Sequence, residues 1–350
     1  MSTATVSAAE ALRRQATFST HHIVSLPIVV LMAHSRCNCR CVMCDIWQAN
    51  AMRRELTRDD LQPHLADLRR LHVQRVVLSG GEALMHSNLW LLCELLREFA
   101  SSITLLSTGL LLETHADNVV RWCDEVIVSV DGSREVHDSI RRIPNAFDRL
   151  ARGVASLRAR VAGFPVSGRC VLQRQNFRDL PRIIDAAHEV GLDHISFMSV
   201  DVASSAFNRP IPWEEPRVQE VALSVEETAE FNALVEDTIV RYAADFASGF
   251  ISENPTKLRR LPQYFAALNG LANYPETVCN APWVSTVIEA DGDVRPCFFH
   301  APMGNIHQAP LESILNAPAS VAFRRQLNVK TDPICRACVC TLQLGRRSPA

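Results

Sequence analysis

The chain has 350 residues, of which 47% are hydrophobic and 21% are charged, and its formal net charge at pH 7 is −2. This length suggests two domains, or one large α/β domain with an appendage, and the composition is that of a globular protein rather than a disordered one. The nearly balanced charge gives no indication of nucleic acid or of a membrane as a partner.

An apolar run, IVSLPIVVLMA, occupies residues 23–33 and follows Arg13 and Arg14. This order loosely imitates a secretory signal, but the run is too short to span a bilayer, contains Pro27 and lacks a convincing small-x-small cleavage site. We interpret it as a fully buried strand. The predicted location is therefore cytoplasmic, and in that reducing compartment the twelve cysteines are not expected to form disulfides.

Short β-type runs alternate with helical patterns along the next part of the chain. The predicted strands are 27–32, 74–82, 103–109, 124–132, 166–173 and 193–200, and the helical patterns between them include 58–71, 147–161 and 180–191. Repeated strand–helix units favour parallel strands joined by right-handed crossovers. Several strands end in small or polar residues, at the strand ends where β/α barrels gather their functional groups. The predicted fold class is therefore α/β, with a partial (β/α)6 TIM-like barrel.

The pattern changes after the last predicted strand. Residues 201–223 read as a polar, proline-containing loop, and Ser224 with Glu227 forms a capping box that starts a helix. Short β-like pieces and cysteines follow, with a hairpin turn predicted at 290–294, and together they predict a small α+β domain. We divide the chain into an N-terminal extension, the barrel, a helical connection and the C-terminal domain, at residues 1–24, 25–223, 224–274 and 275–350.

Four cysteines crowd the stretch SRCNCRCVMCDIW, which follows the first strand. Cys37, Cys41 and Cys44 have the spacing C-x3-C-x2-C, so their thiolates can face a common point and leave one position of a metal open. Thiolates favour zinc or iron–sulfur clusters. By spacing alone, a zinc site completed by His34 or Cys39 remains an alternative.

The residues around these cysteines resemble the radical S-adenosylmethionine (radical SAM) enzymes, and the likeness covers most of residues 25–200. That family places C-x3-C-x-aromatic-C just after its first strand, and here Met43 stands at the aromatic position as a soft apolar substitute that can pack on an adenine. LSGGEALMH (78–86) matches the family's Gly-Gly-Glu at the end of the second strand, where glycines permit close backbone approach. VSVDGSREVHDSIRR (128–142) is close to its Ser-x-Asp-Gly…His-Asp-x-x-Arg pattern.

The resemblance implies that Cys37, Cys41 and Cys44 hold a [4Fe–4S] cluster whose unique iron binds the amino and carboxylate groups of S-adenosylmethionine (SAM). The implied SAM contacts are Met43 at the adenine, Gly80, Gly81 and Glu82 at the methionine amino group, Ser129 and Asp131 at the ribose or methionine moiety, and Arg141 at the carboxylate. The alternative for Arg141 is a surface or helix-end salt bridge. Cys39 is expected to point away from the cluster.

A second group of cysteines stands near the C-terminus, at Cys279, Cys297, Cys335 and Cys338. Spacing alone allows a closed zinc ribbon. Beside a radical SAM core, these cysteines resemble the SPASM or twitch extension, and MGNIHQAPLESILNAP (303–318) resembles that extension's Gly-Asn-Ile…Leu-x-x-Ile stretch. This likeness implies one auxiliary [4Fe–4S] cluster. Cys340 is expected to replace a ligand, to be free, or to return a hydrogen atom to the substrate.

The activity implied by the resemblance is reductive cleavage of SAM to a 5′-deoxyadenosyl radical, which takes hydrogen from a small polar substrate. We predict two-electron oxidation (dehydrogenation) of a sugar or aminocyclitol-like molecule in natural-product biosynthesis, supplied with single electrons by a flavodoxin or ferredoxin. The alternatives are a radical epimerase with Cys340 as hydrogen donor, a maturase of a ribosomally made peptide, and an inactive zinc-binding scaffold. His300 and the 201–223 loop are candidate substrate contacts, although a structural or exposed His300 is the simpler interpretation.

Overall fold

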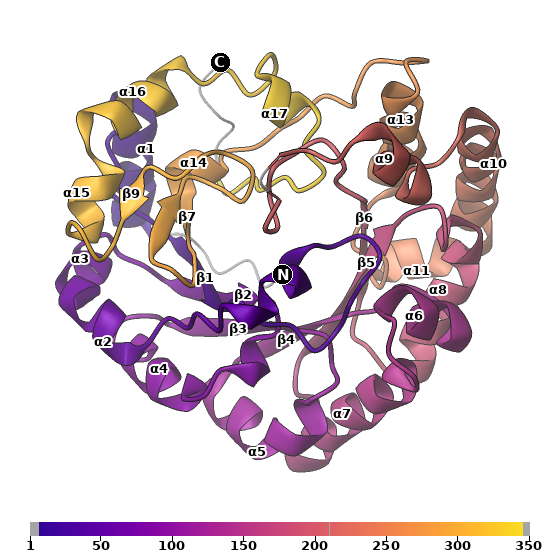
Figure 1. The fold of residues 1–350 in the computed structure, drawn as a ribbon, viewed down its shortest axis with the longest axis horizontal. Helices are drawn as coiled ribbons and strands as arrows, with labels where there is room; N and C mark the ends of the chain where they lie inside the picture. The colour runs from indigo at the N-terminus through magenta and orange to yellow at the C-terminus, as the bar shows by residue number, and fades with distance from the viewer. Residues whose placement is uncertain (1–6, 210, 346–350) are drawn as a thin grey trace.

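A curved sheet of parallel strands forms the centre of the protein, with helices along its outer side (Figure 1). The computed structural model describes residues 7–209 and 211–345. The first six strands are β1 (Ile28–His34), β2 (Arg75–Gly80), β3 (Ser102–Ser107), β4 (Glu125–Ser129), β5 (Val166–Leu172) and β6 (Ile195–Ser199). Each pairs in parallel with its neighbour in sequence, so the predicted six-stranded partial barrel is confirmed.

The helices follow the predicted alternation, with one break. They are α1 (Ala8–Thr20), α2 (Arg58–Leu61), α3 (Leu65–Arg70), α4 (Leu89–Leu96), α5 (Leu112–Trp122), α6 (Arg134–Arg141), α7 (Ala146–Arg160), α8 (Leu180–Val190), α9 (Glu215–Val221), α10 (Val225–Arg241), α11 (Ala243–Ser248), α12 (Pro255–Leu258), α13 (Arg260–Leu268), α14 (Ala281–Val284), α15 (Leu311–Leu315), α16 (Pro318–Gln326) and α17 (Pro333–Arg336). The single helix predicted at 58–71 is split by a 3₁₀ turn at Gln62–His64, because Pro63 cannot donate a backbone hydrogen bond. The capping box of Ser224 and Glu227 is present at the start of α10.

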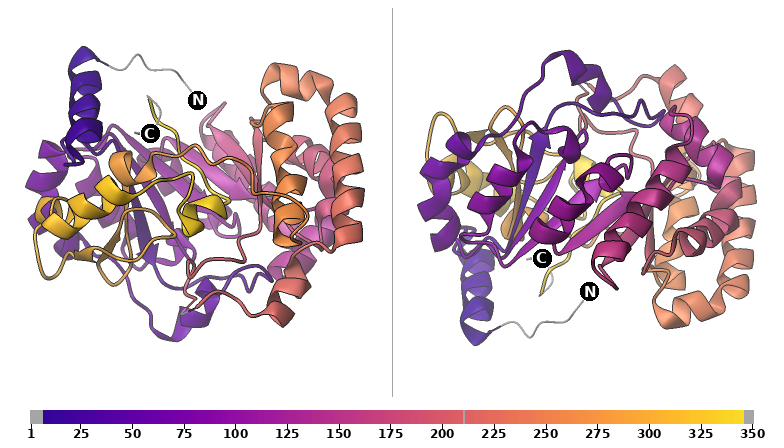
Figure 2. Two further views of the ribbon diagram at one scale, coloured as in Figure 1. Left: turned by 90° about the horizontal axis from the view of Figure 1, so that it is seen from above. Right: turned by 90° about the horizontal axis from the view of Figure 1, so that it is seen from below.

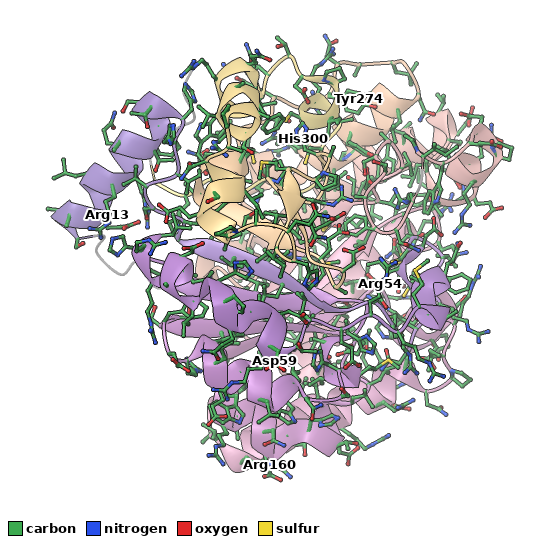
Figure 3. All side chains as sticks on the ribbon, turned by 60° about the vertical axis from the view of Figure 1, so that its left-hand side comes forward. Arg13, Arg54, Asp59, Arg160, Tyr274 and His300 are labelled. Carbon is green, nitrogen blue, oxygen red and sulfur yellow. The ribbon has the colours of Figure 1, made fainter. Side chains whose placement is uncertain are left out.

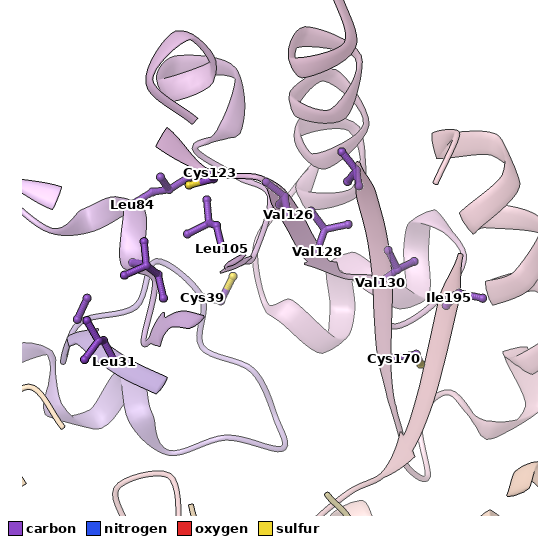
Figure 4. Close-up of a cluster of buried hydrophobic side chains, with 14 of the residues drawn as sticks. Leu31, Cys39, Leu84, Leu105, Cys123, Val126, Val128, Val130, Cys170 and Ile195 are labelled. Carbon is purple, nitrogen blue, oxygen red and sulfur yellow. The ribbon is translucent and has the colours of Figure 1, made fainter. Parts of the chain in front are cut away.

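Side chains on the barrel strands alternate between two environments. In β4, Val126 and Val128 are fully buried beneath the helices, whereas Ile127 and Ser129 are partly exposed on the opposite, inner side. Figure 4 shows the buried set, in which residues of neighbouring strands pack side by side. The inner side therefore stays accessible near the carboxyl ends of the strands, where the motif residues lie.

The C-terminal domain joins the barrel through its first strand. β7 (Ser285–Ile288) pairs in parallel with β1, on the edge opposite β2. β8 (Asp293–Arg295) and β9 (Gly304–Asn305) continue the same sheet in antiparallel fashion, which confirms the hairpin predicted at 290–294. The C-terminal part, orange to yellow in Figure 2, lies across the sheet from the helices of the first half. Its cysteines thus share a scaffold with the barrel.

The N-terminal extension contains α1, which packs against the C-terminal domain. Phe18 belongs to a small second core with Trp283, Val284 and Val329. The apolar run at residues 23–33 contributes β1, as predicted, rather than a helix. None of the described helices has the length and apolar character that crossing a bilayer requires.

Candidate active site

The loop that carries the first cysteines is held against the end of β2. The backbone N–H of Gly81 donates to the His34 carbonyl at 2.9 Å, and that of Glu82 donates to the Arg36 carbonyl at 2.8 Å. A Cβ atom on Gly81 would lie 2.0 Å from the Arg36 oxygen and 2.9 Å from the Cys37 nitrogen. The two backbones therefore approach so closely that only glycine fits between them.

The four cysteines of this loop lie near one another, and Cys39 is the most deeply buried of them. Cys39 is 1% exposed, and its thiol makes side-chain hydrogen bonds to the thiols of Cys37 and Cys41. The charges of Cys41 and Cys37 also act on Cys44, whose pKa is raised to about 12, mainly by burial. The side chain of Cys39 packs into the hydrophobic core (Figure 4), and the expectation that it points away from the cluster stays a prediction.

Arg141, at the end of α6, brings a buried positive charge to these thiols. Its guanidinium lies 3.5 Å from the Cys41 sulfur and forms an ion pair with Asp131. The hydrogen bond from Cys39 and the charge of Arg141 lower the pKa of the Cys41 thiol, which favours the thiolate that metal binding requires. The surface alternative for Arg141 is wrong, since the residue is 6% exposed, although it does sit at a helix end in a salt bridge.

Glu82 is fully buried, and protein groups surround its carboxylate. Oε2 accepts hydrogen bonds from the backbone N–H and the hydroxyl of Thr108, both at 2.7 Å, and Oε1 accepts from the Ser107 hydroxyl at 3.0 Å. Burial raises the pKa of Glu82, while these donors favour the ionised form. The residue thus links the ends of β2 and β3 in addition to placing a negative charge in the site.

The other predicted SAM contacts occupy the same end of the barrel. Met43 is buried among the loop cysteines, Gly80 ends β2 at a φ of +124°, and Ser129 ends β4 on the inner side. Asp131 accepts a hydrogen bond from the backbone of Val171 at 3.0 Å, in addition to its ion pair. The motif residues that are separated in sequence are therefore brought together at the carboxyl ends of β1 to β4.

The C-terminal cysteines form a second group, and Cys340 belongs to it. The charge of Cys340 contributes to raising the pKa values of Cys279, Cys297 and Cys338. The charges of Cys297 and Cys279 contribute in the same way to the raised pKa of Cys335. Burial is the main cause that raises the pKa of Cys297, to about 11. Cys340 therefore lies in the neighbourhood of the four cysteines that the sequence indicated as ligands.

His300, labelled in Figure 3, is buried and contacts one thiol of this second group. Its Nε2 is 3.4 Å from the Cys335 sulfur, and its ring packs edge-on against Phe323 with the centroids 5.0 Å apart. The structural interpretation of His300 is therefore supported. Sequence spacing offered no signal for this contact, because 35 positions separate the two residues.

The loop after β6 contacts residues that stand next to a cysteine in each of the two groups. The side chain of Arg209, which is 1% exposed, forms an ion pair with Asp201 at 2.8 Å and reaches to 3.7 Å from the carboxylate of Asp45, the residue after Cys44. Phe207 packs on Phe298, the residue after Cys297, with ring centroids 6.0 Å apart. The loop therefore packs against the residue that follows Cys44 in the first group and against the residue that follows Cys297 in the second group.

Two protein-family models match the chain, Radical SAM superfamily over residues 33–198 and the SPASM iron–sulfur cluster-binding domain over residues 279–339. The chain is a member of the radical SAM superfamily and has a SPASM domain at its C-terminal end. These matches bear out the predicted family, the enzyme class of a radical SAM enzyme, and the cofactors SAM, its [4Fe–4S] cluster and auxiliary iron–sulfur. The two separate groups of buried and partly buried thiols fit two such centres, since thiolates are the ligands of iron–sulfur clusters.

Two known enzymes and one solved structure are among the proteins similar to this chain. Fe-coproporphyrin III synthase of Methanosarcina barkeri is 26% identical over 306 residues, which cover 82% of this chain and 73% of the relative. Pre-heme d1 synthase of Dinoroseobacter shibae is 29% identical over 170 residues, which cover 48% of this chain and 42% of the relative. The crystal structure of Streptococcus suis SuiB bound to S-adenosylmethionine has a similar fold, with a TM-score of 0.60 at 12% identity, over 95% of this chain and 76% of that one.

The close contact at Gly81 generates a test of the first site. We expect Gly81→Ala to push the cysteine loop away from β2 and to lower the iron content of the reconstituted protein by about four atoms per chain, one cluster. Gly270→Ala is the control, because a Cβ at Gly270 meets nothing within 4 Å, and its φ of +72° makes the added methyl group at least as demanding on the backbone as at Gly81. Iron and sulfide analysis after anaerobic reconstitution measures the effect, and equal iron in the two variants would contradict it.

Proposed function

We propose that this protein uses radical SAM chemistry to oxidise a small polar substrate by two electrons. The single observation that supports oxidation is the second group of partly buried thiols, which offers a place for an electron acceptor in addition to the SAM site. A barrel that holds its cofactors at the strand ends positions the reacting atoms and excludes water. A sugar or aminocyclitol-like molecule is the proposed substrate.

The residues proposed to hold the first [4Fe–4S] cluster are Cys37, Cys41 and Cys44. Three protein ligands leave one iron for SAM, and the bound cluster supplies the electron that cleaves SAM to the 5′-deoxyadenosyl radical that abstracts hydrogen. Arg141 compensates the thiolate charge, and its remaining donors are suited to the SAM carboxylate.

Further residues are proposed to orient SAM within the barrel. Glu82, with Gly80 and Gly81, receives the methionine ammonium group; because protein donors already surround the Glu82 carboxylate, the glycine carbonyls share this role. Ser129 and Asp131 face the ribose or methionine moiety, and Met43 supports the adenine.

The auxiliary cluster is proposed to be held by Cys279, Cys297, Cys335 and Cys338. Cys340 lies with these thiols, which supports a spare or exchangeable ligand at that position rather than a hydrogen donor facing the substrate. This placement favours oxidation over the epimerase alternative, which needs a thiol beside the substrate carbon. A flavodoxin or ferredoxin is the proposed electron donor for the first cluster.

A tetrapyrrole is the second candidate substrate. The observation in its favour is that two curated relatives are named Fe-coproporphyrin III synthase and pre-heme d1 synthase. Coproporphyrin carries carboxylate side chains, so both candidate substrates are polar at their periphery. Both candidate substrates can undergo two-electron oxidation.

A pair of neighbouring cysteines tests the first cluster. We expect Cys41→Ala to lose about four iron atoms per chain and to form no 5′-deoxyadenosine from SAM and dithionite. Cys39→Ala removes an equally buried thiol of the same loop, and we expect it to retain both iron and SAM cleavage. Iron analysis and chromatography of 5′-deoxyadenosine give the readouts. Equal iron loss in the two variants would instead make Cys39 a ligand.

Deuterated water distinguishes the reaction types. We expect turnover of candidate sugars, aminocyclitols and tetrapyrroles with SAM and reductant in deuterated water to yield an oxidised product with no deuterium at the attacked carbon. Mass spectrometry and NMR measure this outcome. An unoxidised product carrying solvent deuterium at an inverted centre would establish epimerisation and overturn the proposed oxidation.

The contact between His300 and Cys335 predicts a redox effect. Hydrogen bonds to cluster sulfurs stabilise the reduced state, so we expect His300→Phe to lower the auxiliary midpoint potential by about 60 mV, the one-electron equivalent of a hydrogen bond worth about 1.4 kcal/mol. His307→Phe is the control, since His307 is a half-exposed histidine of the same domain. A redox titration followed by electron paramagnetic resonance measures the potential, and an unchanged value in His300→Phe would exclude this role.

A further inference from the structure

A pocket lies at the edge of the barrel, where β6 meets α12, α13 and the segment after α17. Its lining includes Ser199, at the carboxyl end of β6, and Cys338, one of the C-terminal thiols. Figure 1 shows β6, α13 and α17 on this side of the barrel. We call this cavity the seam pocket, because the barrel and the C-terminal domain meet there. It lies between the strand ends and the second group of cysteines.

The seam pocket carries an excess of positive charge. Lys257, Arg260 and Arg336 all line it, and Lys257 is balanced by Glu253, which lies 3.6 Å away. Within residues 7–209 and 211–345, neither Arg260 nor Arg336 forms an ion pair. Two guanidinium groups therefore remain without a carboxylate partner at one small pocket, and guanidinium is the side chain that best matches a carboxylate or phosphate.

Hydroxyl groups line the inner wall of the same pocket. Ser199 is 4% exposed, and its Oγ has no hydrogen-bond partner among the described residues. Burying a hydroxyl without a hydrogen-bond partner is costly, so its presence indicates a partner from outside the protein. The hydroxyl of Tyr264 lies in the same lining, and burial raises its pKa well above the ordinary value, so it stays protonated and able to donate.

We propose that the seam pocket binds an anionic group of the substrate, a carboxylate or a phosphate, through Arg260 and Arg336, with the hydroxyls of Ser199 and Tyr264 as hydrogen-bond donors. This inference rests on the proposed function and narrows its substrate from a polar molecule to an anionic one. The pocket borders Cys338, so a substrate anchored there lies next to the site proposed for the electron acceptor.

The test measures anion binding to the reconstituted holoenzyme at low ionic strength, where charge pairs are least screened. Inorganic phosphate and succinate are the two probes, and succinamide, which has the shape of succinate without its charge, is the neutral control. We expect saturable binding of at least one anion by calorimetry or ligand-observed NMR and none of succinamide. Preference for phosphate or for succinate identifies which anionic group the pocket takes.

Variants assign the binding to the pocket. We expect the double variant Arg260→Gln/Arg336→Gln to bind the anion at least about tenfold more weakly, and Arg336→Lys to recover part of the affinity. Arg182→Gln is the matched control, because Arg182 is 76% exposed on α8. The inference is overturned if neither anion binds, if succinamide binds as tightly, or if the double variant binds like the parent.

The same preparations separate this inference from the proposed function. Formation of 5′-deoxyadenosine by the parent enzyme reports radical SAM activity and does not depend on the probes. Cleavage of SAM without anion binding overturns the seam pocket alone. Anion binding in a reconstituted protein that never cleaves SAM overturns the proposed function and leaves the pocket as a binding site.

Discussion

The backbone contact between the cysteine loop and the end of β2 is the constraint on which the first site depends. At Gly81 the Arg36 carbonyl comes so close that no side chain can stand between the two segments. The loop is therefore pressed onto the strand ends, where Cys39 enters the core and Cys41 meets the guanidinium of Arg141. The next residue, Glu82, is buried by the same contact and ties β2 to β3, so one close approach arranges the thiols and the neighbouring acid together.

Buried charge is the second requirement of this site. Thiolates gathered in a core are costly unless a cation compensates them, and a buried cation is costly for the same reason. The free-energy cost of burying these charges is reduced because the Arg141 guanidinium contacts both the Asp131 carboxylate and the Cys41 sulfur. Asp131 is in turn held by the backbone of β5, so the charge balance of the cysteine loop extends across the barrel.

The two groups of cysteines belong to one continuous structure. β7 extends the barrel sheet beside β1, and the loop after β6 bonds to Asp45 through Asn208 while Phe207 packs on Phe298. Packed protein therefore connects the two groups. The seam pocket is bordered by β6 and by Cys338, so it adjoins the second group.

The amino-acid sequence alone determined the features that depend on residues near one another in the chain, namely the strands, the helices and the short motifs. The strands were predicted because short apolar runs are typical of buried strands. The two groups of cysteines, Gly-Gly-Glu and the stretch from Asp131 to Arg141 were recognised because the residues of each motif lie close together in the chain. Only the tertiary structure decided that Cys39 joins its neighbours, that Cys340 joins the C-terminal thiols, that His300 meets Cys335 and that Arg209 reaches Asp45. Some of these contacts link residues up to 164 positions apart, and others depend on the direction in which a side chain points. The spacing of residues along the chain predicts neither long-range contacts nor side-chain directions. Such pairs meet only when parallel strand ends and the returning C-terminal strand are packed into one sheet, because packing then sets which side chains share a buried volume.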